Sequence, residues 1–65
     1  MAKTRTYQEE IGLVVSNMRR EKGLTQAQLA DMIGTSQSAI HRIEKGDQNT
    51  SLEMIKKVSS ALGGQ

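Results

Sequence analysis

The chain contains no cysteine, proline, tryptophan or phenylalanine, and it has one tyrosine and one histidine. Without cysteine it can form no disulfide, thiolate metal site or thiol nucleophile, and one histidine is too few for a histidine-rich zinc site. The missing aromatic residues leave no platform for stacking single-stranded bases. No apolar run approaches the roughly 18 residues of a membrane span, and residues 1–8 lack the apolar stretch of a signal peptide. We therefore expect a cytoplasmic protein that uses no cofactor or metal.

The 65 residues leave room for one small domain, since domains usually contain roughly 100–200 residues. Hydrophobic residues make up 35% of the chain, and six residues are glycine. This composition is close to that of globular proteins, with a core built from aliphatic residues and methionine. The net charge of +2 is compatible with binding nucleic acid, but a charge this small does not indicate it alone.

The start of the chain predicts an arm followed by a helix. Residues 1–8 are polar and include Lys3 and Arg5, so we expect a flexible N-terminal arm. From Glu9 the apolar residues recur with the spacing of one helix face. They are Ile11, Val14, Val15 and Met18. Gly23 supplies the C-terminal stop of this helix.

Three further helices are indicated by their cap residues and stops. Thr25, Ser36 and Ser51 are N-caps, and Gln28 completes a capping-box pattern with Thr25. The second helix then runs from Gln26 to about Ile33, the third from Gln37 to Lys45, and the fourth from residue 52 to the Gly63–Gly64 pair. Their inward faces are Leu29, Ala30, Ile33, Ile40, Ile43, Leu52, Ile55, Val58 and Leu62. No apolar run alternates as in a strand, so we expect an all-α bundle of four or five short helices.

The second and third helices form a helix-turn-helix. Ala30 lies four residues after Gln26, where two helices must approach closely, and Gly34 follows four residues later. A turn at Gly34 needs a left-handed backbone, which glycine adopts without a steric penalty. Two short helices joined by such a turn are typical of DNA-binding proteins.

The sequence resembles the phage-repressor family of helix-turn-helix proteins, also called the Cro-like or xenobiotic-response-element family. The resemblance covers about residues 10–63 and rests on IGLVVSNMRREKGLTQAQLADMIGTSQSAIHRIEKG followed by SLEMIKKVSSALG. It implies a lambda-repressor-like domain that binds double-stranded DNA in a sequence-specific way. Such a domain regulates transcription by occupying an operator, usually as a homodimer on a palindromic site.

The resemblance also implies roles for individual residues. The positions that usually reach base edges are Gln37, Ser38 and Arg42, and His41 lies beside them on the same side of the helix. The positions that usually touch phosphates are Thr25, Gln26, Ser36, Lys45, Asn49 and Thr50. Arg19 and Glu44 match a pair that joins the first helix to the end of the third. If that pair is exposed, it contributes only about 0–1 kcal/mol.

The sequence departs from the family pattern at two places. The family often has a proline before the fourth helix, where this chain has Thr50–Ser51, and it often adds a fifth helix that helps dimerisation. We therefore expect residues 9–65 to form a helix-turn-helix domain that is the N-terminal part of a longer protein.

The sequence also bears on two other classes of function. The same helices could serve as a protein-interaction or regulatory module, either antitoxin-like or appended to a larger enzyme. Such a module needs an exposed apolar patch, for which the sequence offers Leu13 and Met54. An enzyme is not expected, because the chain has no paired-carboxylate motif and no glycine-rich phosphate loop.

Overall fold

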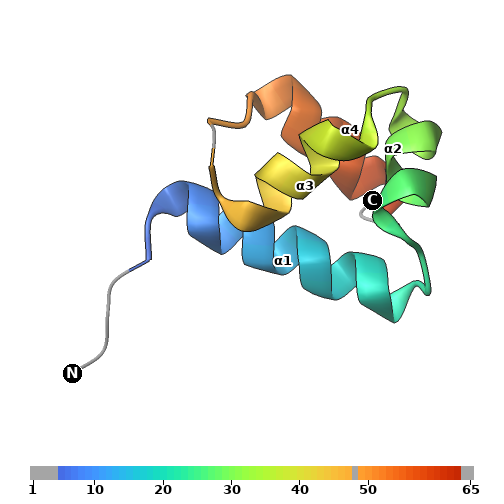
Figure 1. The fold of residues 1–65 in the computed structure, drawn as a ribbon, viewed down its shortest axis with the longest axis horizontal. Coiled ribbons are helices and arrows are strands. Elements are labelled where there is room, and N and C mark those ends of the chain that lie inside the picture. Colours follow the sequence, from blue (N-terminus) through green and yellow to red (C-terminus); the bar gives the residue numbers. More distant parts are fainter. Residues whose placement is uncertain (1–4, 48, 64–65) are drawn as a thin grey trace.

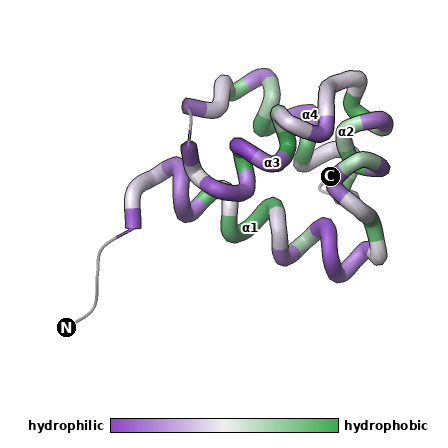
Figure 2. The backbone as a smooth tube through the Cα atoms, viewed as in Figure 1, coloured by the Kyte–Doolittle hydropathy of each residue, from purple (hydrophilic) through white to green (hydrophobic). Residues whose placement is uncertain are grey.

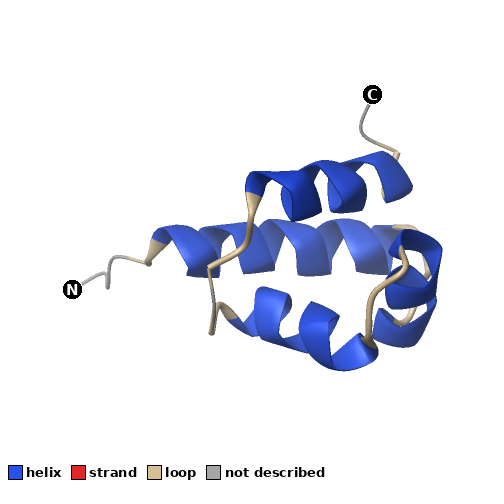
Figure 3. Ribbon diagram, turned by 90° about the horizontal axis from the view of Figure 1, so that it is seen from above, coloured by secondary structure: helices blue, strands red, loops and turns tan. Residues whose placement is uncertain are grey.

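Four helices follow one another in the computed structural model, which describes residues 5–47 and 49–63 (Figure 1). They are α1 (Tyr7–Glu21), α2 (Gln26–Ile33), α3 (Gln37–Lys45) and α4 (Leu52–Ala61). Figure 3 shows helices and loops but no strand in these residues. The all-α prediction is confirmed, and within the described ranges the number of helices is four. None of these helices is long and apolar enough to cross a membrane.

Helix α1 begins at Tyr7, two residues earlier than predicted. The Thr6 hydroxyl accepts a hydrogen bond from the Glu9 backbone N–H, and the Glu9 carboxylate accepts one from the Thr6 N–H at 2.8 Å. This capping box starts the helix inside the segment that was expected to be an arm. Arg5 lies 3.4 Å from the Glu10 carboxylate, while Lys3 lies outside the described residues. The prediction missed Thr6 although its Thr-x-x-Glu pattern is present in the sequence.

The other helix starts agree with the prediction. Thr25 and Gln28 form a reciprocal capping box, and the hydroxyls of Ser36 and Ser51 each accept a hydrogen bond from the third residue of their helix. Gly34 has φ +73°, which confirms the left-handed turn between α2 and α3. These contacts are local, so a cap residue largely determines where its helix begins.

The core is aliphatic and draws on all four helices. Its buried hydrophobic members are Val15, Leu29, Ala30, Ile40, Ile43, Val58 and Leu62. In Figure 2 the central turns of α1 are hydrophobic and both of its ends are hydrophilic. The prediction that Val14 and Leu52 face inward is wrong, because their exposed fractions are 54% and 68%. Val14 faces a groove that α4 does not close, and Leu52 lies in the first turn of α4, ahead of the residues that pack on the core.

Helix α1 approaches the end of α3 very closely at Gly12. Gly12 and Ser16, one turn apart on α1, are both buried. A Cβ atom at residue 12 would lie 2.4 Å from the Ile43 carbonyl oxygen and 2.5 Å from that of Glu44. Only glycine fits this contact, which sets the position of α3 relative to α1.

Candidate nucleic-acid interface

The outer side of α3 presents four polar side chains together. Gln37, Ser38, His41 and Arg42 are all exposed and line one shallow hollow. The inner side of the same helix is fully buried, with Ile40 at 0% exposure. The helical repeat produces this division, since residues one turn apart share a side. The structure therefore brings together all four residues that were predicted to touch bases.

The N-termini of α2 and α3 both offer hydrogen-bond donors. The Thr25 hydroxyl oxygen accepts from the Gln28 N–H at 3.0 Å, which leaves the hydroxyl proton available to an outside acceptor. Ser36, at the N-terminus of α3, uses its hydroxyl in the same way with Ala39 at 3.1 Å. The first backbone N–H groups of a helix have no partner within the helix. Both predicted phosphate positions therefore have donors suited to an anion.

Arg19 and Glu44 form a two-point pair that links α1 to α3. Arg19 Nε donates to Glu44 Oε2 at 2.6 Å, and Arg19 Nη2 donates to Oε1 at 3.0 Å. A third donor, Arg19 Nη1, reaches the Leu24 carbonyl oxygen at 2.7 Å. The side chains of Arg19 and Glu44 are only 11% and 7% exposed. The contribution of about 0–1 kcal/mol expected of an exposed ion pair therefore does not apply to Arg19 and Glu44. Removal of either side chain would leave the other as a nearly buried charge without its partner.

Gln26 joins this pair through its side chain. Its Nε2 atom donates to Glu44 Oε1 at 3.1 Å. Burial is the largest single influence on the pKa of Glu44 and raises it, but the hydrogen bonds from Arg19 and Gln26, with the nearby positive charges, lower it below its ordinary value. The hydrogen bond to Glu44 is the main cause that raises the pKa of Arg19. Both groups therefore stay charged at neutral pH. The sequence did not predict the contact between Gln26 and Glu44, which are 18 residues apart.

The three remaining predicted phosphate residues lie in different surroundings. The Lys45 ammonium is exposed and lies 3.7 Å from the Asp47 carboxylate. Asn49 accepts a hydrogen bond from Gln8 in the first turn of α1. Thr50 is half-buried and faces the same end of α1. Asn49 and Thr50 do not line the hollow on α3.

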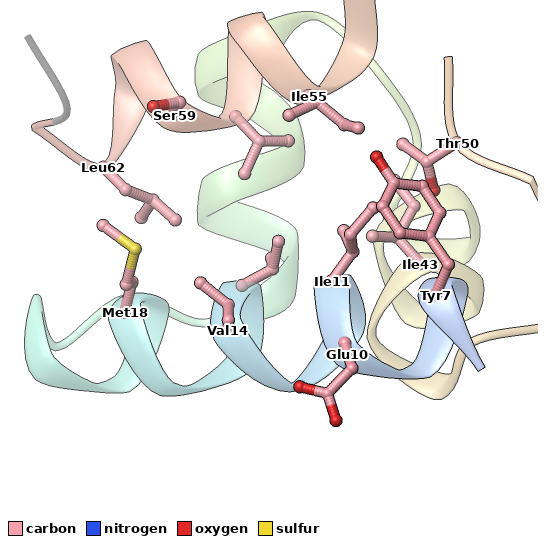
Figure 4. A pocket seen from close by; sticks show the side chains of 12 residues that line it. Tyr7, Glu10, Ile11, Val14, Met18, Ile43, Thr50, Ile55, Ser59 and Leu62 are labelled. Carbon is pink, nitrogen blue, oxygen red and sulfur yellow. The ribbon is translucent and has the colours of Figure 1, made fainter. Parts of the chain in front are cut away.

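An apolar groove lies between α1 and α4, with a cavity volume of about 290 Å³. Figure 4 shows Tyr7, Ile43 and Thr50 at one end of it and Met18 and Leu62 at the other. Ile43 belongs to α3 but lies on its buried side, away from the hollow. The groove is therefore separate from the polar surface of α3. The sequence did not predict it, because it depends on the spacing of two helices far apart in the chain.

The two residues proposed from the sequence as an apolar patch behave differently. Leu13 is 41% exposed, whereas Met54 is half-buried and packs against the core. They do not form one patch, and neither residue lines the groove.

Comparison with known proteins finds one matching family and several relatives. The family described as helix-turn-helix matches residues 15–65. The immunity repressor protein of Bacillus phage phi105 is 38% identical over 55 residues, which are 85% of this chain and 38% of that protein. The competence pilus inhibition repressor of Acinetobacter baylyi is 38% identical over 53 residues, covering 82% of this chain and 48% of that protein. This chain thus spans less than half of either repressor.

A solved structure supports the same assignment. The restriction-modification controller protein C.AhdI from Aeromonas hydrophila has a TM-score of 0.82 and 34% sequence identity. The match covers 85% of this chain and 80% of that one. The fold, the turn at Gly34 and the family match agree with one another. The chain therefore belongs to the helix-turn-helix family of phage-repressor type.

Proposed function

We propose that this protein binds double-stranded DNA at a specific sequence and regulates transcription by occupying an operator. The observation that carries the proposal is the hollow on α3, where Gln37, Ser38, His41 and Arg42 stand together and exposed. A helix that is polar on one side and buried on the other can enter the major groove without loss of core packing. The repressors and transcriptional regulators among the relatives support the same function.

Base recognition follows from the chemistry of two side chains. Gln37 can form two hydrogen bonds with N6 and N7 of adenine, and Arg42 can form two with O6 and N7 of guanine. Each such pair discriminates against a wrong base by roughly 1–3 kcal/mol. Ser38 and His41 add less selective contacts at the same surface. In this arrangement the exposed side of α3 faces the bases, from Gln37 in its first turn to Arg42 in its last.

Phosphate contacts supply affinity and register. Thr25, Gln26 and Ser36 offer uncharged donors at two helix starts, and Lys45 adds a cation. We propose that Asn49 and Thr50 have the same role. They would contact the phosphates of the DNA strand that borders the major groove occupied by α3. Because these groups carry little net charge, one copy binds weakly. Its affinity falls as salt increases, because Lys45 displaces a counterion from the phosphate that it contacts.

Two copies would overcome this weak binding. We propose a homodimer on a palindromic site, with two α3 helices about 34 Å apart so that each enters a major groove on one face of the duplex. Occupancy needs no chemical step, so we propose that the protein acts without catalysis, in the cytoplasm.

The test begins with selection of duplexes from a random-sequence pool by the purified protein. Isotope-labelled protein is then titrated with a selected duplex at two salt concentrations and followed by NMR. We expect shifts at residues 25–26, 36–45 and 49–50 that weaken with salt. Shifts absent even at low salt would overturn the proposal.

Replacement of one base-contact residue separates sequence recognition from general affinity. We expect Arg42→Ala to weaken binding to the selected duplex by roughly 1–3 kcal/mol and to relax the preference at one base pair. Lys57→Ala, on the exposed side of α4, is the matched control and should change neither. An equal loss of affinity for all duplexes in Arg42→Ala would contradict its role at a base.

A further inference from the structure

The geometry points to a positioning role for Glu44: we propose that its carboxylate holds the Gln26 side chain in the orientation that contacts a DNA phosphate. This inference rests on the proposed function and names the residue that organises one of its contacts. Three elements meet at Glu44, namely α1 through Arg19, the start of α2 through Gln26, and α3 itself.

The Glu44 carboxylate fixes which way the Gln26 amide points. An ionised carboxylate only accepts hydrogen bonds, and the lowered pKa of Glu44 keeps it ionised at neutral pH. The Gln26 group that faces Glu44 Oε1 at 3.1 Å must therefore be the NH₂. One of its two N–H bonds is used in this contact, and the other remains to donate to an acceptor outside the protein.

Arg19 neutralises the Glu44 carboxylate, which would otherwise repel nearby phosphates. A free carboxylate beside the DNA backbone would repel phosphates, but two Arg19 donors neutralise Glu44 at 2.6 and 3.0 Å. The Glu44 side chain is 7% exposed, so it is screened from the DNA, while its partner Gln26 is half-buried rather than fully buried. Arg19 also holds the Leu24 carbonyl oxygen, which fixes the loop that leads to Gln26. The Gln26 side chain is thereby ordered before DNA arrives, which lowers the entropy lost on binding.

The first experiment maps single phosphates on a duplex selected by the wild-type protein. Each phosphate near the site is replaced in turn by an uncharged methylphosphonate, and affinity is measured. The phosphate that Gln26 contacts is the one whose replacement weakens the wild type but not Gln26→Ala. We expect an effect of about three- to tenfold there, as for one hydrogen bond. In the Glu44→Gln variant, replacement of the phosphate that Gln26 contacts should no longer weaken binding. Replacement of the other contacted phosphates should still weaken it as in the wild type.

A double-mutant cycle provides a second readout. Glu44→Gln removes a negative charge and so raises affinity for any DNA, but this effect is equal with and without Gln26 and cancels in the cycle. We expect Glu44→Gln and Gln26→Ala to be coupled by about threefold or more in affinity. The control cycle pairs Glu44→Gln with Ser38→Ala and should be additive, because Ser38 does not contact Glu44. A purely structural role of Glu44 would affect both cycles alike.

The outcomes separate this inference from the proposed function. A wild-type protein that selects no duplex would overturn DNA binding itself. A wild type that binds, with no phosphate specific to Gln26 or with full sensitivity retained in Glu44→Gln, would overturn the positioning role alone. If Glu44→Gln does not fold, the wild type still gives an answer by NMR. The Gln26 side-chain NH₂ protons should exchange more slowly than those of exposed Gln37 without DNA, and equal rates would refute the contact.

Discussion

The contact between α1 and α3 at Gly12 predicts that Gly12→Ala destabilises the protein, although helix propensity alone predicts that it stabilises it. Alanine is favoured over glycine inside a helix by about 1 kcal/mol, so Gly12→Ala would stabilise an isolated α1. In the folded protein the new Cβ would lie 2.4 Å from the Ile43 carbonyl oxygen and 2.5 Å from that of Glu44. Both are backbone atoms, so a change of side-chain rotamer cannot relieve the clash.

The loss of stability in Gly12→Ala follows from how far α1 and α3 must move apart to relieve the clash. Ordinary contact begins near 3.4 Å, so α1 and α3 must separate by about 1 Å. Overpacking of a core costs roughly 1–3 kcal/mol of folding free energy. Because a separation of about 1 Å affects the whole contact between two helices, we expect a cost of about 3 kcal/mol. After the gain in propensity, we expect Gly12→Ala to lower the free energy of unfolding by about 2 kcal/mol. For a domain of this size that corresponds to a fall in Tm of roughly 8–16 °C.

Thermal unfolding followed by circular dichroism tests this expectation. Asn17→Ala is the matched control, because residue 17 is exposed on the same helix and gains propensity without meeting another element. Its Tm should stay equal or rise slightly. A Tm for Gly12→Ala at or above that of the wild type would refute the close approach of α1 to α3.

Three further predictions concern single residues. Lys45→Ala should weaken binding to all duplexes alike and reduce the slope of log affinity against log salt by about one; an unchanged slope would remove Lys45 from the phosphate contacts. Gly34→Val should lower Tm strongly, because a β-branched residue is costly at φ +73°. Gly34→Asn, which tolerates that conformation, should lower it less, and similar Tm values for the two variants would contradict the left-handed turn. Since the pKa of Glu44 is lowered in the folded state, its charge stabilises the fold above the ordinary value of 4.5, and this contribution is lost as pH falls below it. Urea unfolding should therefore show a steeper acid loss of stability in the wild type than in Glu44→Gln, and parallel pH profiles would argue against the charged pair.

Much of the secondary structure could be predicted because it depends on neighbours in the chain. The starts of α2, α3 and α4 follow from Thr25, Ser36 and Ser51, whose hydroxyls each bond a backbone N–H three residues later. Thr6 acts in the same way for α1, and its Thr-x-x-Glu pattern is equally local, so the sequence is sufficient to predict this start as well. The left-handed turn at Gly34 is also a local property of the backbone.

The shared surface of Gln37, Ser38, His41 and Arg42 was likewise predictable. Once α3 is helical and one side is apolar, the spacing of these residues places them on the opposite side. Their position on one hollow needs no knowledge of the other helices. Their role at DNA bases, in contrast, came from the resemblance to a family and remains a proposal.

Only the tertiary structure decided the features that depend on how separate helices meet. Periodicity placed Val14 and Leu52 in the core, but α4 leaves the groove beside Val14 open and its first turn lies outside the packed region. The sequence contains no signal that Gly12 touches the α3 backbone or that Gln26 reaches Glu44. Caps and helix faces act over three or four residues along the chain. The groove, the close approach and the buried pair depend on distances between helices, which are fixed only when the whole core packs.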